Sequence, residues 1–453
     1  MQANPRHERS MQARPRLRVW LSALALVLAL VSALVWPAGP AGAGSPVELA
    51  RRAGLRVLEG RHLTLLTDRP ARDGDGVPDL PGLFDEAFAA WCRHYHVDPA
   101  AHADWRAVGC LIVDRERFRA AGLLPVDGVV PDFENGFCAA DRFWLVDQSN
   151  PDYRRHLLLH EGVHAFTLTL RSAAAPPWYT EGIAELLAMH RLDRAAARGA
   201  RFVPTPIPER PGDVEQLGRI ETLRALSAAG RAPGLEDVFA LPPAAHRELS
   251  AYAASWAAAA FLAGHPTHRT AFAAAERGPL DRDFTNRLTG TPEWDGPRAS
   301  RDFAAFLDDL DYGYDFDRMA VDWAPGRPLA EPHTATVAAD RGWQNAGSML
   351  AAGQACSFRA TGRTTVGRAA GRDLESGPDG ITLRWHRGRP VGRLLVAQWV
   401  EPADGSLPSF RVLGEGAAGR FTAAAAGPLY CKLNESPGEL ADNAGGLTVS
   451  LTP

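Results

Sequence analysis

Lysine is almost missing from this chain. The 453 residues include 49 lysines and arginines, yet Lys432 is the only lysine, so nearly all positive charge is carried by arginine. The basic residues are scattered and the formal net charge is −4, a pattern that argues against nucleic-acid binding. Apolar residues make up 46% and charged residues 23% of the chain. This balance is typical of soluble globular domains, and the length allows two or three of them.

Cysteine is also scarce. There are five cysteines and no C-x-x-C pair, which excludes a disulfide-rich scaffold and argues against a zinc site built from cysteine. An exported chain can still form a disulfide. We expect it between Cys356 and Cys431, because both lie in the same apparent β domain.

Residues 1–43 differ in character from the rest of the chain. Five arginines precede the apolar run 19–36, and the small residues Ala41-Gly42-Ala43 follow. A basic region, an apolar segment and an A-x-A-like site are typical of a secretory signal peptide, and Met11 offers an alternative start. The apolar run is also of borderline length for an uncleaved membrane anchor. Either reading puts the globular part outside the cytoplasm: secreted, periplasmic or at the cell surface.

The remaining chain is expected to form two domains. Residues 46–322 combine an α/β part with a mainly helical part. The α/β part has expected strands within 55–68, 107–118 and 142–148 and a helix at 80–97. Residues 323–332 are rich in proline and glycine and are expected to be a linker. In residues 333–453 short apolar stretches alternate with glycine-rich turns, which predicts an all-β sandwich.

The stretch His160-Glu161-Gly162-Val163-His164 carries the clearest chemistry. It lies in an apolar segment with helical spacing, and Asn150-Pro151 is a good helix start before it. Histidines four apart on a helix point to one side, where both imidazoles can bind the same Zn²⁺ ion. The neighbouring glutamate can then act as a general base on zinc-bound water. Alternatively, the two histidines are buried or pair with carboxylates.

A second expected helix follows at residues 176–192, with Pro177 near its first turn. Glu181 and Glu185 lie four apart and share one face of it. Two histidines and one carboxylate leave the fourth zinc position open, which is the usual arrangement of catalytic zinc.

These two elements resemble the gluzincin superfamily of zinc peptidases. The segment Trp178-Tyr179-Thr180-Glu181-Gly182-Ile183-Ala184-Glu185 is similar to the W-x-x-E-G-x-A-E element of its peptidase MA-like families. The resemblance implies that His160, His164 and Glu181 bind Zn²⁺, that Glu161 is the general base and that Glu185 hydrogen-bonds a ligand histidine. Sixteen residues separate His164 from Glu181. This connection is somewhat shorter than in the aminopeptidase N-like members of the superfamily, which leaves Glu185 as the alternative ligand.

The reaction also needs a donor for the oxyanion. Tyr252 is the candidate, because it lies on a later expected helix at 248–265, where some relatives have a catalytic tyrosine. His246 and Tyr179 are the rival candidates, and a core position beside Trp256 is the non-catalytic alternative for Tyr252.

The C-terminal domain resembles the calcium-dependent, galactose-binding bacterial lectin fold. The similar segments are 342–347, 377–380, 434–438 and 442–445. The resemblance implies a Ca²⁺ site formed by the side chains of Glu435, Asp442 and Asn443 and by backbone carbonyls near Glu439 and Val366. Glu435 and Asp442 depart from the lectin pattern, which has an aspartate and an asparagine there.

The sequence thus predicts an exported zinc peptidase with a lectin-like domain. Its substrate would be a peptide or protein, and a sugar-binding domain would favour glycosylated or cell-surface proteins by tethering. The alternative is a surface carbohydrate-binding or adhesion protein whose zinc site is structural or inactive.

Overall fold

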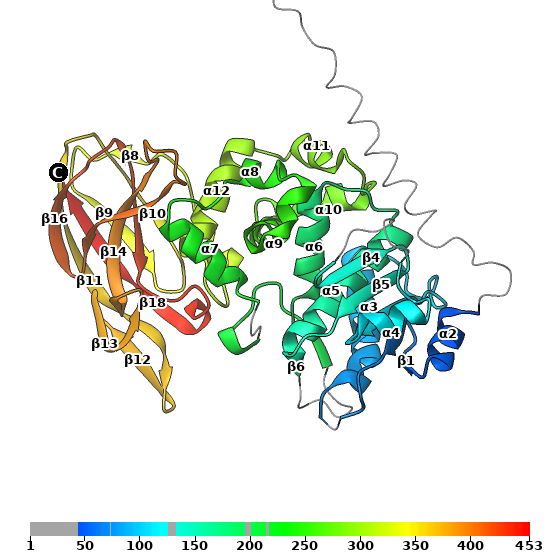
Figure 1. Cartoon of the computed structure of the whole chain (residues 1–453). Coiled ribbons are helices and arrows are strands. Elements are labelled where there is room, and N and C mark those ends of the chain that lie inside the picture. Colours follow the sequence, from blue (N-terminus) through cyan, green and yellow to red (C-terminus); the bar gives the residue numbers. More distant parts are fainter. Residues whose placement is uncertain (1–43, 73, 126–132, 194, 196–200, 214–216) are drawn as a thin grey trace, which may run out of the picture.

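The structure is a computed structural model that describes residues 44–453 except 73, 126–132, 194, 196–200 and 214–216. The expected leader at residues 1–43 lies outside the described residues. Within the described ranges, no helix is both long enough and apolar enough to cross a membrane. The molecule combines helices with several β-sheets and is β-rich toward the C-terminus (Figure 1).

The N-terminal part is built on a five-stranded sheet. The strand order is β1-β2-β3-β5-β4. Strands β2, β3 and β5 are parallel, while β1 and β4 run antiparallel at the two edges. The strand bounds are β1 Arg56–Glu59, β2 Leu63–Thr67, β3 Ala107–Ile112, β4 Gly136–Ala139 and β5 Arg142–Val146.

Two details of this sheet differ from the expectation. Only the first half of segment 107–118 is a strand, because Asp114 caps a short helix, α4 (Arg115–Ala120), and ends the strand. The edge strand β4 was not predicted at all. Its four residues are all only partly buried and include a glycine and an alanine, so they show neither the alternation nor the β-branched residues typical of a strand.

Helix α5 (Pro151–Leu170) carries the histidine motif. It begins as expected, because the Asn150 side chain accepts hydrogen bonds from the backbone N–H groups of Asp152 and Tyr153. Gly162 allows α5 to approach α3 (Leu80–His94) closely: a Cβ atom at this position would lie 2.5 Å from the Phe84 ring. The glycine inside the motif therefore serves helix packing.

The helical part surrounds α6 (Pro177–Ala188) and α9 (Leu249–Gly264). These two helices are in close contact, since a Cβ at Gly182 would lie 2.3 Å from the Ser255 carbonyl oxygen. Most of α9 is buried on all sides, as its nearly continuous apolar sequence requires. The other elements are α2 Pro46–Arg52, β6 His190–Asp193, β7 Arg201–Pro204, α7 Arg219–Ala228, α8 Leu235–Phe239, α10 Arg269–Arg277, α11 Phe284–Thr289, α12 Gly296–Asp309 and α13 Phe316–Met319.

Residues from 327 onward form two facing sheets. One has the order β13-β14-β17-β10-β8, with β15 also paired to β14. The other has the order β12-β11-β18-β9, with β16 also paired to β11. Inward-facing apolar side chains of both sheets make one core. The bounds are β8 Arg327–Pro328, β9 His333–Ala338, β10 Gln344–Leu350, β11 Ala355–Ala369, β12 Arg372–Ser376, β13 Asp379–His386, β14 Arg389–Val400, β15 Ser409–Glu415, β16 Ala418–Thr422, β17 Gly427–Leu433 and β18 Asn443–Thr452.

The β-rich part is packed directly on the helical part. Ala305 of α12 lies in one apolar cluster with Trp343, Phe410 and Tyr430. The single lysine lies at this junction: Lys432 Nζ donates to both Asp309 carboxylate oxygens, at 2.9 and 2.7 Å, although both side chains are buried. An apolar contact and a buried ion pair thus connect the two parts.

The expected disulfide is absent. All five cysteines are free thiols, and Cys356 and Cys431 are both buried in the core of the β-rich part. They lie on β11 and β17, which belong to different sheets. Shared membership in one domain was the only basis for the pairing, and it does not determine the orientation that a disulfide needs.

Candidate metal centre

Three side chains converge at one point between α5 and α6. The Nε2 atoms of His160 and His164 lie 3.1 Å apart, and Glu181 Oε2 lies 3.3 Å and 3.5 Å from them. The two histidines come from successive turns of α5 and the carboxylate comes from the first half of α6. The fold therefore places the two elements noted in the sequence next to each other.

The spacing of these atoms fits a zinc ion. Ligand atoms at about 2.0–2.1 Å from a tetrahedral zinc lie about 3.3 Å from one another, and the three observed distances cluster around that value. Together the three side chains would supply two imidazole nitrogens and one carboxylate oxygen, which is a common donor set of catalytic zinc.

Glu161 lies beside this group, facing the edge strand β4. Its side chain is buried, and a Cβ atom at Gly136 would lie 2.3 Å from Glu161 Oε1. The glycine at the start of β4 therefore leaves the space that the carboxylate fills. Burial raises the pKa of Glu161, and the nearby histidines oppose this shift. A carboxylate with a raised pKa is a better proton acceptor.

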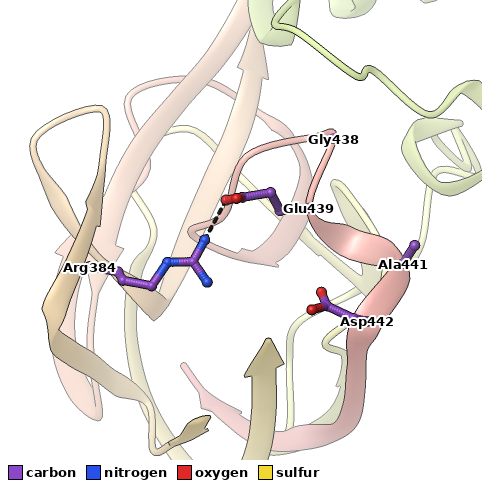
Figure 2. A pocket seen from close by; sticks show the side chains of 5 residues that line it. All are labelled: Arg384, Gly438, Glu439, Ala441 and Asp442. Carbon is purple, nitrogen blue, oxygen red and sulfur yellow. Dashed lines mark hydrogen bonds and ion pairs between the residues drawn. The ribbon is translucent and has the colours of Figure 1, made fainter. Parts of the chain in front are cut away.

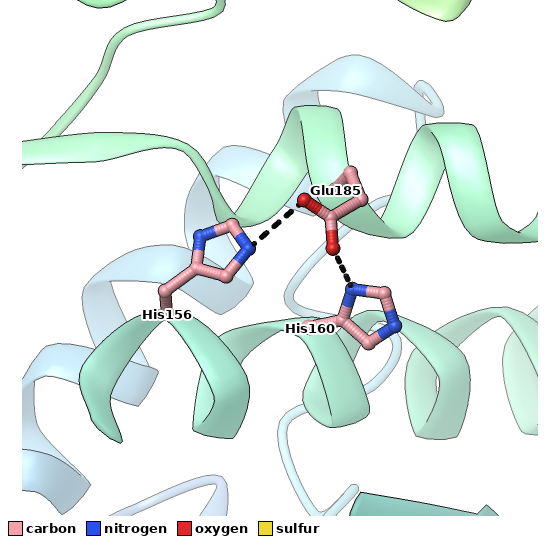
Figure 3. A group of neighbouring side chains, drawn as sticks. All are labelled: His156, His160 and Glu185. Carbon is pink, nitrogen blue, oxygen red and sulfur yellow. Dashed lines mark hydrogen bonds and ion pairs between the residues drawn. The ribbon is translucent and has the colours of Figure 1, made fainter. Parts of the chain in front are cut away.

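Glu185 lies on the other side of His160 (Figure 3). Its Oε1 is 3.2 Å from His160 Nδ1, and its Oε2 is 3.2 Å from His156 Nε2. The same carboxylate accepts two hydrogen bonds from the buried side chain of Arg219, at 3.0 and 2.9 Å.

Two overlapping groups in this region can be compared as metal sites. His156, His160 and Glu185 are close enough together to bind an ion, and so are His160, His164 and Glu181. In the first group a guanidinium already balances the carboxylate charge. In the second group Glu181 Oε2 lies at ion-pair distance from both imidazoles. The second group is therefore the better site for a cation, and Glu185 is placed to orient His160.

The charges at the site favour a cation. Burial opposes the protonation of His160, but the carboxylates of Glu181 and Glu185 overcome it and raise its pKa to about 10. Burial also opposes the ionisation of Glu181, but its contacts with His164 and His160 lower its pKa. Without a bound metal, a proton on His160 would thus balance the negative charge of the two carboxylates. A metal cation can balance the same charge instead.

Among the three candidates for the oxyanion donor, Tyr252 has its ring packed against His160. Its ring centroid is 6.1 Å from that of His160 and 5.4 Å from that of His246. His246 itself lies 2.9 Å from Ser255 Oγ through Nε2. Tyr179 is buried in the core and its hydroxyl donates to Glu276, so this hydroxyl is already used elsewhere.

A third histidine-rich group lies away from this site. His265, His268 and Asp302 are all buried and close together. Asp302 lies 2.8 Å from His268 Nε2, accepts a hydrogen bond from the Trp323 indole at 2.6 Å and faces Arg298 at 3.5 Å. Because N–H donors already surround this carboxylate, we assign the group a structural role, in which Asp302 connects the two histidines to Trp323.

Asp442, one of the side chains expected to bind calcium, lies at a pocket of the β-rich part. This pocket of about 240 Å³ is lined by Arg384, Gly438, Glu439, Ala441 and Asp442 (Figure 2). Arg384 donates to Glu439 Oε2 at 2.6 Å and to the Val366 carbonyl at 3.4 Å.

Two acceptor atoms near this pocket are unsatisfied. Glu435 Oε2 and Asn443 Oδ1 are buried and have no hydrogen-bond partner, as acceptors at a cation site would be. However, Arg384 already contacts the Val366 carbonyl, one of the oxygens that the lectin resemblance assigns to Ca²⁺. The arrangement does not fit calcium, because a positive side chain already lies among its oxygens.

Sequence reasoning missed three residues of the zinc-like site. His156 was not among the predicted site residues, although its position four residues before His160 puts it on the same helix face. Arg219 and Gly136 had no recognisable signal. Arg219 is 34 residues from Glu185, and Gly136 belongs to a strand that was not predicted.

The site defines a class of protein: one with a two-histidine, one-carboxylate group and an adjacent buried glutamate. Comparison with known proteins does not extend this description. No family model matches the chain, and no curated protein matches it. Among solved structures, one similar chain is described as the EclA N-terminal domain, a PllA-like lectin. It is 20% identical, with a TM-score of 0.20, over 26% of this chain and 94% of that chain. A match this weak carries no argument about function.

Proposed function

We propose that this protein is an exported zinc-dependent peptidase of the gluzincin type. The observation that supports it best is the convergence of His160, His164 and Glu181, whose ligand atoms are spaced 3.1–3.5 Å apart beside the buried Glu161. Bound to these three side chains, Zn²⁺ would activate a water molecule and polarise a carbonyl group.

The protein groups around the metal position have distinct roles in this proposal. The Glu161 carboxylate accepts the proton of the attacking water and later passes it to the leaving amine. The Tyr252 hydroxyl donates a hydrogen bond to the carbonyl oxygen as its negative charge develops. Glu185 holds the His160 ring by its Nδ1 side.

Strand β4 offers a place for the substrate. It pairs with β5 on one side and ends the strand order of the sheet on the other. An extended peptide can add to such an edge through backbone hydrogen bonds. Because Gly136 of β4 touches Glu161, a peptide bound there would pass close to the general base. This placement supports a peptide or protein substrate over a small molecule.

The decisive experiment compares wild type with Glu161→Gln on a proteome-derived peptide library. We expect about one zinc per chain in both, with cleavage reduced at least about 100-fold in the variant. Glu116→Gln is the matched control, because Glu116 is an exposed residue of α4. This control variant should cleave the library as wild type does. Identical product profiles for wild type and Glu161→Gln would refute the peptidase proposal.

The rival proposal is a surface carbohydrate-binding or adhesion protein that uses the C-terminal pocket. The two unsatisfied acceptors, Glu435 Oε2 and Asn443 Oδ1, favour it, and Arg384 opposes it. Calorimetric titration with Ca²⁺, followed by galactose, separates the cases. We expect no Ca²⁺ binding in wild type. Ca²⁺-dependent sugar binding that survives removal of zinc, in a chain that cleaves no peptide, would establish the rival.

A further inference from the structure

We propose that Arg219 is a positioning residue of the metal centre, which acts on zinc through Glu185. The inference rests on the zinc-binding part of the proposed function. Arg219 is the first residue of α7, more than 50 residues from the histidine motif in sequence, yet its side chain is only 7% exposed and lies against the site.

The contact between Arg219 and Glu185 is bidentate. Arg219 Nε donates to Oε2 at 3.0 Å and Nη2 donates to Oε1 at 2.9 Å. Two parallel hydrogen bonds from a planar guanidinium fix the plane of the carboxylate as well as its position. Each Glu185 oxygen then faces one imidazole of α5, with Oε1 toward His160 and Oε2 toward His156.

This carboxylate lies at the Nδ1 side of the His160 ring. Oε1 of Glu185 lies 3.2 Å from Nδ1 of His160, while Nε2 of the same ring faces Glu181 and His164. A carboxylate at Nδ1 favours the tautomer whose Nε2 lone pair is available to a metal. Without Arg219, the buried negative charge of Glu185 would lose its arginine partner, and its plane would no longer be fixed.

Arg219 also faces the oxyanion-donor candidate. Its guanidinium carbon lies 5.6 Å from the centre of the Tyr252 ring, within the range of a cation–π contact. One side chain therefore contacts both Glu185 and Tyr252. This explains why an arginine is placed here: lysine has no planar face for the ring and no fork for the carboxylate.

The test measures Zn²⁺ affinity by competition with a chromogenic chelator, a readout that needs no catalytic activity. We expect Arg219→Met to weaken zinc binding about 10- to 100-fold, as loss of an outer-shell partner does in other zinc proteins. Arg219→Lys should recover part of the loss. Glu185→Gln should weaken binding similarly, and the double variant should be no weaker than the weaker single variant, because both changes break one interaction.

Arg154→Met is the matched control. Arg154 is also buried and also bonds a carboxylate, Asp147, but at the start of α5. It should lower the unfolding midpoint and leave zinc affinity unchanged. Circular dichroism shows whether each variant is folded. If Arg219→Met does not fold, the zinc affinity of Arg219→Lys is the test.

The outcomes separate the two proposals. A wild-type chain that binds no zinc overturns the proposed function together with this inference. A wild type that binds zinc, with folded Arg219 variants of equal affinity, overturns this inference alone. Additive losses in the double variant would also overturn it, since Arg219 would then act by a route other than Glu185.

Discussion

At the scale of single residues, the site depends on where side chains find space. Glu161 can lie between the histidine pair and β4 only because residue 136 has no side chain. The same holds for charge: Glu181 faces two imidazoles, while Glu185 is already paired with Arg219. Two glutamates four residues apart thus have different chemistry, because their surroundings differ.

Gly136→Ala tests this steric argument. A methyl group there would lie 2.3 Å from Glu161 Oε1, so the carboxylate must move. We expect peptide cleavage to fall by about 100-fold, as misplacement of a catalytic group by an ångström can cost, while zinc affinity stays at the wild-type value. Steady-state kinetics and zinc titration on the same preparation check both points. Full activity in the alanine variant would show that the Glu161 side chain does not need the space left by Gly136.

At the scale of elements, the motif helix is held by close packing. Helix α5 lies against α3 through Gly162, where an added Cβ would be 2.5 Å from Phe84 and 2.8 Å from Trp91. Both rings are fully buried in the main core. The helix therefore has little freedom to shift, which suits a metal site that needs fixed ligands.

Gly162→Ala and Gly82→Ala form a matched pair of tests for this packing. Both glycines lie inside helices, but a Cβ at Gly82 would have no atom within 4 Å. We expect Gly162→Ala to lower the free energy of unfolding by about 1–3 kcal/mol through overpacking. Gly82→Ala should raise it by about 0.5 kcal/mol, because alanine favours the helix. Denaturant unfolding of both variants is the measurement, and equal effects would contradict the packing argument.

At the scale of the whole molecule, the junction between the helical and β-rich parts is built like a core. Lys432 and Asp309 form a buried ion pair next to an aromatic cluster, and the exposed Arg387 also donates to Asp309. The Lys432 ammonium also lies 4.7 Å from the centre of the Trp343 ring. We infer that the two parts unfold as one unit.

Lys432→Met tests the coupling of the two parts. It leaves Asp309 buried with only Arg387 as its cationic partner, so the free energy of unfolding should fall by about 3 kcal/mol. Lys432→Met combined with Asp309→Leu should recover most of the loss, because it removes both charges from the junction. Calorimetry would follow both variants. Two separate transitions in wild type would contradict the single-unit view.

Acid should destabilise the fold through buried histidine. Burial lowers the pKa of the His265 imidazole, which is 4% exposed, to about 4. The unfolded chain then binds more protons than the folded chain below about pH 6.5. The contribution of His265 to the free energy of unfolding is therefore fully present above pH 6.5. It is lost as the pH falls toward 4, by up to about 3 kcal/mol. Unfolding titrations of wild type and His265→Gln between pH 7 and 4.5 should show a shallower pH dependence in the variant.

Several features followed from the sequence alone. The Asn150-Pro151 helix start, the helix that carries His160 and His164, and the β-rich C-terminal region were predicted and are present in the structure. These features depend on residues that are neighbours in the chain, through capping, helical spacing and the alternation of apolar stretches with turns. Local interactions of this kind can be read from a single sequence.

Only the tertiary structure decided the rest. It showed which glutamate faces the histidine pair, that β4 lies beside Glu161, that Arg219 reaches Glu185, and that Cys356 and Cys431 are free thiols on different sheets. Each of these depends on residues far apart in sequence, and helical spacing treats Glu181 and Glu185 alike. What distinguishes such residues is the charge and the space around them, and these arise only when distant elements pack together.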